Sequence, residues 1–264
     1  MPMANVNGNA THYVDKGDGT AGTILLLHGF PLNGTMWKPQ VEALSAKWRV
    51  IAPDFRGFGE SAETQAFSIE GLAEDVHALA KELGLHKFFL AGLSMGGYVA
   101  LAYVKKYAAT LRGLMLLDTK AEPDTADGKV NRDRMIAIVK DRGAKPIADA
   151  MLPKLVPAEV IQHRPQLVRE LRQMMEQTRP QTIAHALAAM RDRPDRSEEL
   201  EKIEVPTLVI VGEKDSITPP EVMKAMAQKI PGAELRVIVG AGHMSNMEQA
   251  SQVNGVIEQF VGAT

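Results

Sequence analysis

A serine at position 94 lies in a sequence suited to nucleophilic chemistry. It stands in the middle of Gly-Leu-Ser-Met-Gly-Gly, residues 92–97, between an apolar run at 88–91 and a helix-forming stretch at 98–103. This pattern predicts a strand, a sharp turn and a helix, with the serine at the turn. Small neighbours suit a strained turn, and the free N–H groups at the helix start would point toward the atom under attack. We therefore interpret Ser94 as a nucleophile rather than as a helix cap.

The base that must activate this serine is expected to be His243. A serine hydroxyl is a poor nucleophile at neutral pH, and histidine can take its proton and return it. His243 ends the sequence Gly-Ala-Gly-His directly after the apolar run 235–239. The other histidines without supporting glycines are interpreted as surface or packing residues: His12, His77, His86, His163 and His185.

A carboxylate is needed to fix the histidine tautomer and to stabilise the imidazolium. Three acidic residues follow apolar runs and compete for this role: Asp118, Glu213 and Asp215. We favour Asp215, which begins a turn before two prolines, and keep Asp118 as the substitute.

The negative charge that develops on the attacked carbonyl oxygen requires N–H donors. The first is expected to be the backbone N–H of Met95, directly after the serine, and the second that of Phe30. Phe30 belongs to His-Gly-Phe-Pro, residues 28–31, which follows the apolar run 23–27. The side chain of His28 is expected to brace this loop by hydrogen bonding rather than to take part in the chemistry.

Apolar runs that alternate with helical patterns must position these groups, and they predict a mostly parallel sheet covered by helices on both faces. Ligands collect at the carboxyl ends of such strands, where the reactive residues also fall. Residues 3–15 are expected to form an edge hairpin. Strands are predicted at 23–27, 50–52, 88–91, 114–118, 207–211 and 235–239, and helices at 37–48, from Ser68 to Gly84, from Pro219 to Ile230 and at 246–261.

The alternation stops between about residues 119 and 204, a stretch rich in Met, Leu, Ala, Arg and Gln and divided by prolines. We predict three or four helices there, inserted between two late strands as a cap. The expected organisation is a core at 1–118, a helical cap at 119–204 and the rest of the core at 205–264. Methionines of the cap could form an adaptable apolar wall, although core packing is the simpler role for most of them: Met135, Met151, Met174, Met175 and Met190.

Composition narrows the classes of function. The 264 residues carry a net charge of −2 with no basic run, so nucleic acid and anionic membranes are not expected partners. The absence of cysteine excludes disulfides, thiolate zinc sites and cysteine nucleophiles. A polar N-terminus and the lack of a long apolar stretch favour a cytoplasmic protein. No metal-binding H-E-x-x-H, phosphate loop or dinucleotide fingerprint is found in the sequence.

Five sequence motifs together resemble the α/β-hydrolase superfamily: residues 28–31, 54–61, 92–97, 212–215 and 240–243. The resemblance implies an α/β-hydrolase fold, a Ser…Asp…His order for the three reactive residues, and no metal or organic cofactor. Residues 92–97, 206–215 and 242–249 are similar, more narrowly, to bacterial carboxylesterases and 3-oxoadipate enol-lactonases, while cofactor-free haloperoxidases share similar turns. A serine at position 94 argues against the dehalogenase and epoxide-hydrolase branches, which use aspartate there.

The sequence therefore predicts a serine carboxylesterase that acts on small, uncharged esters through an acyl-enzyme. One alternative is a lactonase for a carboxylated enol-lactone, and another is a ligand-binding signalling protein that kept the fold. The lactonase requires a cation facing the pocket, for which the cap offers five candidates: Lys154, Arg164, Arg169, Arg172 and Arg179.

Overall fold

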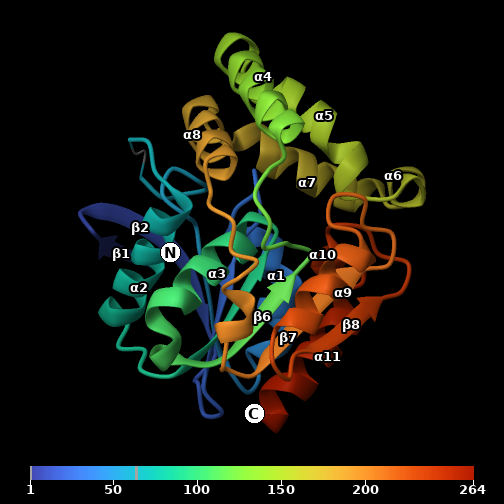
Figure 1. The fold of residues 1–264 in the computed structure, drawn as a ribbon. Helices are drawn as coiled ribbons and strands as arrows, with labels where there is room; N and C mark the ends of the chain where they lie inside the picture. Colours follow the sequence, from blue (N-terminus) through green and yellow to red (C-terminus); the bar gives the residue numbers. More distant parts are fainter. Residues whose placement is uncertain (1, 63–64) are drawn as a thin grey trace.

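The computed structural model describes residues 2–62 and 65–264, and these residues form an eight-stranded sheet (Figure 1). The strand order is β1-β2-β4-β3-β5-β6-β7-β8. The β1–β2 and β2–β4 pairs are antiparallel, and all the other pairs are parallel. The strands are β1 (Met3–Val6), β2 (Asn9–Lys16), β3 (Thr23–Leu27), β4 (Arg49–Pro53), β5 (Phe88–Leu93), β6 (Leu111–Leu117), β7 (Thr207–Gly212) and β8 (Glu234–Ile238). The mostly parallel α/β fold expected from the sequence is confirmed.

The antiparallel edge begins with the predicted hairpin. Asn7 and Gly8 connect β1 to β2, and both have a positive φ, 49° and 82°. A two-residue hairpin loop of this kind matches the natural twist of the strands, and it requires residues that tolerate positive φ. Asn-Gly is the pair that does so most readily, which explains why this short sequence sufficed to predict the hairpin.

Apolar side chains of the central strands alternate between two cores. Leu25 and Leu27 of β3 belong to one core, and Ile24 and Leu26 belong to the other. Helices therefore cover both faces of the sheet, as expected for continuous apolar strands. The first core is covered by α2 (Ile69–Glu82), α3 (Met95–Tyr107) and α9 (Pro220–Lys229), and the second by α1 (Lys38–Leu44), α10 (Ser245–Glu248) and α11 (Ala250–Ala263).

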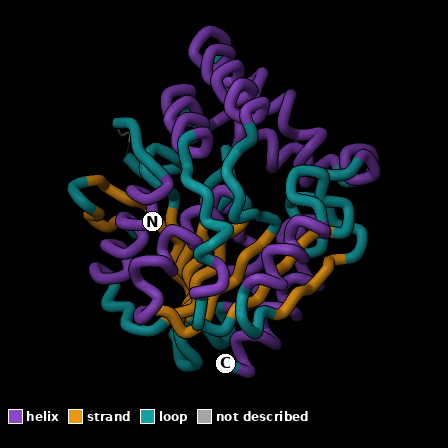
Figure 2. Tube along the Cα trace, in the orientation of Figure 1, coloured by secondary structure: helices purple, strands orange, loops and turns teal. Residues whose placement is uncertain are grey.

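A group of helices lies between β6 and β7 in the sequence and forms the cap at one end of the molecule, well separated from the strands in Figure 2. In the described chain there are five of these helices, whereas three or four were expected. The prediction was wrong because prolines mostly begin helices here and one, Pro153, lies inside a helix. The cap helices are α4 (Ala126–Arg142), α5 (Lys145–Leu155), α6 (Ala158–His163), α7 (Pro165–Gln177) and α8 (Pro180–Arg191).

Two further helices differ from the sequence prediction. The helix expected at 37–48 is a 3₁₀ turn, Gly34–Trp37, followed by the shorter α1. The helix expected at 246–261 is divided into α10 and α11, because Gln249 has non-helical φ and ψ of −128° and 51°. None of the helices in the described chain is both long enough and apolar enough to cross a membrane.

Candidate active site

Ser94 occupies a strained turn between β5 and α3. Its φ of 55° and ψ of −114° lie in a region that L-residues rarely adopt, which typically costs about 1–3 kcal/mol. The surrounding structure holds this conformation: the Ser94 N–H donates to the Leu117 carbonyl at 3.0 Å, and the Ser94 carbonyl accepts from the Thr119 hydroxyl at 2.8 Å. Unlike its buried neighbours, Ser94 is half-buried, so its side chain is accessible.

A close approach of backbones explains the glycine that follows the turn. A Cβ atom placed on Gly96 would lie 2.2 Å from the carbonyl oxygen of Leu27 and 2.9 Å from that of His28. No real Cβ fits at such distances, so only glycine allows α3 to lie against the end of β3. The loop at 28–31 is thereby held beside the serine turn, as a second oxyanion donor would require.

His243 and Asp215 form a buried pair at the carboxyl ends of β8 and β7. Nδ1 of His243 lies 2.8 Å from Oδ2 of Asp215, and the two residues are 1% and 3% exposed. The carboxylate also accepts the Ile217 N–H at 2.8 Å, and the Thr218 N–H and hydroxyl at 3.0 and 2.6 Å. These donors fix the carboxylate, which in turn orients the imidazole.

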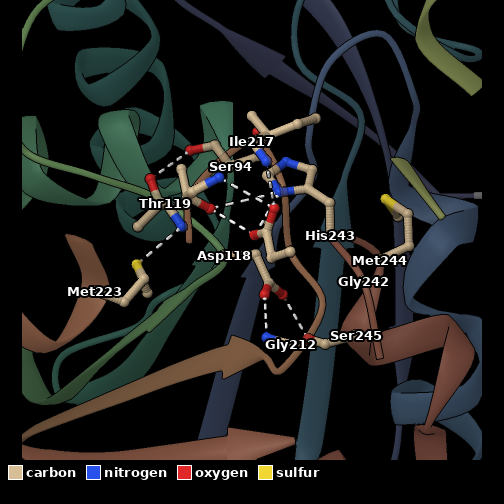
Figure 3. Close-up of polar contacts among 12 residues, drawn as sticks. Ser94, Asp118, Thr119, Gly212, Ile217, Met223, Gly242, His243, Met244 and Ser245 are labelled. Carbon is tan, nitrogen blue, oxygen red and sulfur yellow. Dashed lines mark hydrogen bonds and ion pairs between the residues drawn. The ribbon is translucent and has the colours of Figure 1, made fainter. Parts of the chain in front are cut away.

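The two other acidic candidates do not contact His243 in the described structure. Asp118 accepts the Gly212 N–H at 2.8 Å and hydrogen-bonds to the Ser245 hydroxyl, as Figure 3 shows. Glu213 is exposed and accepts the Gly240 N–H at 2.8 Å. Asp118 therefore connects the ends of β6 and β7 to α10, a bracing role that the sequence did not reveal.

Burial and charge separate the two neighbouring aspartates. Burial raises the pKa of Asp118 well above its usual value, and the nearby charge of Asp215 raises it further. Burial also acts against ionisation of Asp215. The charge and hydrogen bond of His243, together with the two hydrogen bonds from Thr218, outweigh burial and lower the pKa of Asp215 below its usual value. Asp215 is therefore the carboxylate that stays ionised beside the histidine at neutral pH.

Ser94 and His243 are brought to the same edge of the sheet, by β5 and β8, but they are not hydrogen-bonded. Within residues 2–62 and 65–264, no hydrogen bond joins the Ser94 hydroxyl to the imidazole. Nucleophile–base hydrogen bonds are often long before substrate binds and shorten in the reacting complex.

The two expected oxyanion donors belong to segments next to Ser94, the start of α3 and the loop at 28–31 that packs against the serine turn. Met95 is the first residue of α3, where helical N–H groups have no helical partner. Among the described residues, neither its N–H nor that of Phe30 donates a hydrogen bond within the protein. The Phe30 loop is held from the cap by Thr178, whose hydroxyl donates to the Pro31 carbonyl at 2.9 Å.

His28 braces the same loop, as expected. Its Nδ1 lies 3.0 Å from the Gly29 carbonyl oxygen, and its Nε2 accepts the Phe55 N–H at 3.0 Å. This arrangement assigns the proton to Nδ1. Complete burial lowers the pKa of His28 to about 4, so the ring is neutral at physiological pH.

One pair of residues escaped sequence analysis. His12 and Asp54 are both buried, and Nδ1 of His12 lies 2.7 Å from Oδ2 of Asp54. Asp54 follows an apolar run and begins the 54–61 motif, but neither signal indicated His12 as its partner. The other histidines read as surface or packing residues are half-buried or exposed: His77, His86, His163 and His185. In the part of the chain that the structure describes, no cluster of three or more His, Cys, Asp or Glu could hold a metal ion.

Comparison with known proteins agrees with this fold and these motifs. Residues 24–256 match the family described as "Alpha/beta hydrolase family". The AB hydrolase superfamily protein YisY of Bacillus subtilis is 34% identical over 250 residues, covering 90% of each chain. A thermophilic esterase from Thermogutta terrifontis has a similar structure, with 40% identity, a TM-score of 0.95 and coverage of 99% of this chain and 98% of the esterase.

The enol-lactonase from Burkholderia xenovorans is 31% identical, with a TM-score of 0.93 over 99% of this chain and all of that protein. The chain therefore belongs to the alpha/beta hydrolase family, and its structural neighbours include both an esterase and an enol-lactonase.

Proposed function

We propose that the protein is a serine hydrolase that cleaves small, uncharged carboxylic esters. His243 takes the proton of the Ser94 hydroxyl while Oγ of Ser94 attacks the ester carbonyl carbon. The N–H groups of Phe30 and Met95 stabilise the resulting oxyanion, and His243 then protonates the departing alcohol. Water attacks the acyl-serine by the same route, with His243 as base, and releases the acid. Asp215 holds the histidine tautomer and stabilises the imidazolium.

The observation that carries this proposal is the buried His243–Asp215 pair at the sheet edge to which the strained Ser94 turn also belongs. A strained residue persists only where the structure around it enforces the conformation, and such strain clusters at reactive sites. The N–H groups of Phe30 and Met95, which donate no hydrogen bond to any described residue, support the remaining part of an acyl-transfer site.

The arginines of the cap favour a neutral ester over a carboxylated lactone. Arg164 donates to the Glu248 carbonyl at 2.5 Å, and Arg179 donates to the Gly57 carbonyl at 2.9 Å. Arg172 pairs with Asp149, and Arg169 donates to Gln166. Lys154 is exposed on α5. Each of these arginines is thus engaged with the protein, whereas a lactone carboxylate needs an accessible cation in the pocket.

The likeness to the Burkholderia enol-lactonase keeps that activity as a second candidate. A substrate panel decides between the two. It should contain p-nitrophenyl acetate, butyrate and dodecanoate, a neutral lactone, and an enol-lactone that carries a carboxylate. We expect the highest kcat/KM for the short neutral esters. A clear preference for the carboxylated lactone would establish the second candidate, and a preference for dodecanoate would contradict the small-substrate proposal.

Ser94→Ala tests the mechanism, and Ser251→Ala, an exposed serine of α11, serves as its matched control. We expect Ser94→Ala to lower kcat by about 10⁴-fold or more, and the control to behave as wild type. A phosphonate inhibitor should add one covalent group to wild type and none to Ser94→Ala, as measured by mass spectrometry. Binding of esters without turnover by the wild type would instead indicate a receptor.

A further inference from the structure

The carboxylate of Glu248 accepts hydrogen bonds from the backbone on both sides of His243. Oε1 accepts the Met244 N–H at 3.0 Å, and both carboxylate oxygens accept the Gly242 N–H, at 3.1 and 3.0 Å. Glu248 is the last residue of α10 and is only 4% exposed. A buried carboxylate is costly unless its partners compensate, so its position on these two peptide groups calls for an explanation.

Two residues of the cap also hold Glu248 and the histidine loop in place. Nη1 of Arg164, between α6 and α7, donates to the Glu248 carbonyl at 2.5 Å. Pro157, which precedes α6, packs so closely that a Cβ on Gly242 would lie 2.6 Å from its Cδ. The histidine loop is therefore held between α10 and the cap.

Holding the two peptide groups fixes the backbone of His243 and hence the direction of its side chain. Asp215, at 2.8 Å, and the more distant Thr218 hydroxyl, at 3.5 Å, both constrain Nδ1, but contacts at one atom leave the ring able to pivot about it. Proton transfer requires Nε2 to lie within hydrogen-bonding distance of the serine hydroxyl, and a displacement of 1 Å can lower a rate about 100-fold. A constraint on the backbone limits such displacement.

We propose that Glu248 is the positioning residue of His243, and that Arg164 extends this constraint to the cap. The inference rests on the proposed esterase function, since it concerns the base of that reaction. Glu248 touches no reacting atom in this account. It acts through the two N–H groups that it accepts.

The charge state of Glu248 makes the idea testable. Burial raises its pKa to about 7, against the opposing effects of the Gly242 and Met244 N–H groups and the charges of His243 and Arg164. Asp118 is the other acidic group near it. Protonation turns one acceptor oxygen into a hydroxyl donor, which cannot accept an N–H with the same strength. Activity should therefore fall through an additional ionisation as the pH drops below about 7.

Glu248→Gln keeps the shape of the side chain but replaces one acceptor oxygen with a donor group. We expect kcat to fall about 10- to 100-fold at pH 8 while KM changes by no more than about twofold. The pH profile of kcat should become shallower because one ionisation is removed. Glu213→Gln is the matched control, because Glu213 also accepts a loop N–H, that of Gly240, but is exposed.

Arg164→Ala provides a second variant if Glu248→Gln is too unstable to study. It removes only the bond from the cap and should lower kcat a few-fold in the same direction. The Nδ1–H proton of His243 should give a downfield NMR signal in wild type that shifts or broadens in Glu248→Gln. This signal needs no substrate, so it tests the positioning role even if no ester is hydrolysed.

The outcomes separate the two proposals. If wild type and Ser94→Ala are equally inactive, the esterase proposal is wrong, and the NMR signal alone decides on Glu248. If wild type is active but Glu248→Gln retains its kcat, its pH profile and the histidine signal, the positioning role is refuted.

Discussion

Two buried aspartate–histidine pairs of nearly equal geometry lie at different places in this molecule. His243 and Asp215 follow β8 and β7, with a contact of 2.8 Å, whereas His12 in β2 lies 2.7 Å from Asp54 after β4. Both pairs are buried, and both join Nδ1 of the ring to a carboxylate oxygen. Distance and burial alone therefore cannot tell a reactive pair from a structural one.

The surroundings differ. Asp54 also accepts the Gly34 N–H at 2.7 Å and the Glu60 N–H at 3.0 Å, so it ties two loops to the antiparallel edge of the sheet. In the described residues, Nε2 of His12 is buried without a hydrogen-bond partner, and the nearby Ser61 hydroxyl donates to the Asp54 carbonyl. Among the residues that the structure describes, no serine with a positive φ accompanies this pair. The strained serine turn at the same sheet edge, rather than the pair itself, therefore distinguishes the candidate site.

The largest expected effect is the loss of kcat on substitution of Asp215, which belongs to the pair after β7 and β8. Asp215→Asn would present an amide N–H to His243 and favour the wrong tautomer, so kcat should fall about 10⁴-fold with little change in fold. Asp54→Asn, measured with the same ester, should retain most of its kcat per folded molecule. Equal losses in the two variants would mean that the pairs share one role.

For the free energy of unfolding, we expect the His12–Asp54 pair to matter more than it does for kcat. Asp54→Ala leaves a buried histidine and two loop N–H groups without their acceptor, and we expect it to lower the free energy of unfolding by about 3–5 kcal/mol. Urea denaturation followed by circular dichroism measures this loss. Glu60→Ala, which keeps the backbone N–H bonded to Asp54, is the control and should change stability little. A stable Asp54→Ala protein would show that this pair is not a structural tie.

His28 sharpens the comparison because it is a buried histidine that hydrogen-bonds only to backbone groups. Its folded pKa of about 4 lies below the unfolded value of 6.5, so the unfolded state binds a proton first as pH falls. Its contribution to stability is complete above pH 6.5 and is lost between 6.5 and 4. We expect wild type to lose about 3 kcal/mol more than His28→Asn between pH 7 and 4. Parallel losses in urea titrations at the two pH values would contradict this.

The smallest effect concerns strain beside the reactive pair. Ser94→Gly should raise the free energy of unfolding by about 1 kcal/mol, because glycine accepts the positive φ that serine tolerates poorly. The same change removes the nucleophile, so stability and activity should move in opposite directions. Ser251→Gly, within a regular helix, should instead lower stability. A destabilised Ser94→Gly protein would indicate that the turn is not strained.

The parallel strands and the turns at their carboxyl ends were predictable because their signals are local. Apolar runs define β3, β5 and β7, and a glycine lies within two residues of the end of each run. The helical cap was predictable as an interruption of this pattern, although its number of helices was not. A proline can begin a helix, break it or lie within it, and only packing decides which.

Contacts between distant segments were beyond such reasoning. His12 and Asp54 are 42 positions apart, and β2 alternates too weakly to show that His12 faces inward. Glu248 belongs to residues 242–249, which carry the narrower resemblance, but the pattern does not show that its carboxylate turns inward onto the Gly242 and Met244 N–H groups. Its inward direction depends on the interruption of the helix at Gln249, which depends in turn on how α10 and α11 pack. These residues became visible only once the chain was folded.

The position of the cap in the chain divides the chemistry between two lengths of polypeptide. The Ser94 hydroxyl and the two N–H groups that we propose as oxyanion donors are synthesised before the cap, whereas Asp215 and His243 come after it. Gly143 lies between α4 and α5, and no atom of another residue beyond its chain neighbours lies within 4 Å of the place where a Cβ would be, so the chain could be divided there. If the chain were divided at Gly143, one fragment would lack Asp215 and His243 and the other would lack Ser94. Ester cleavage would then report that the two fragments had reassembled.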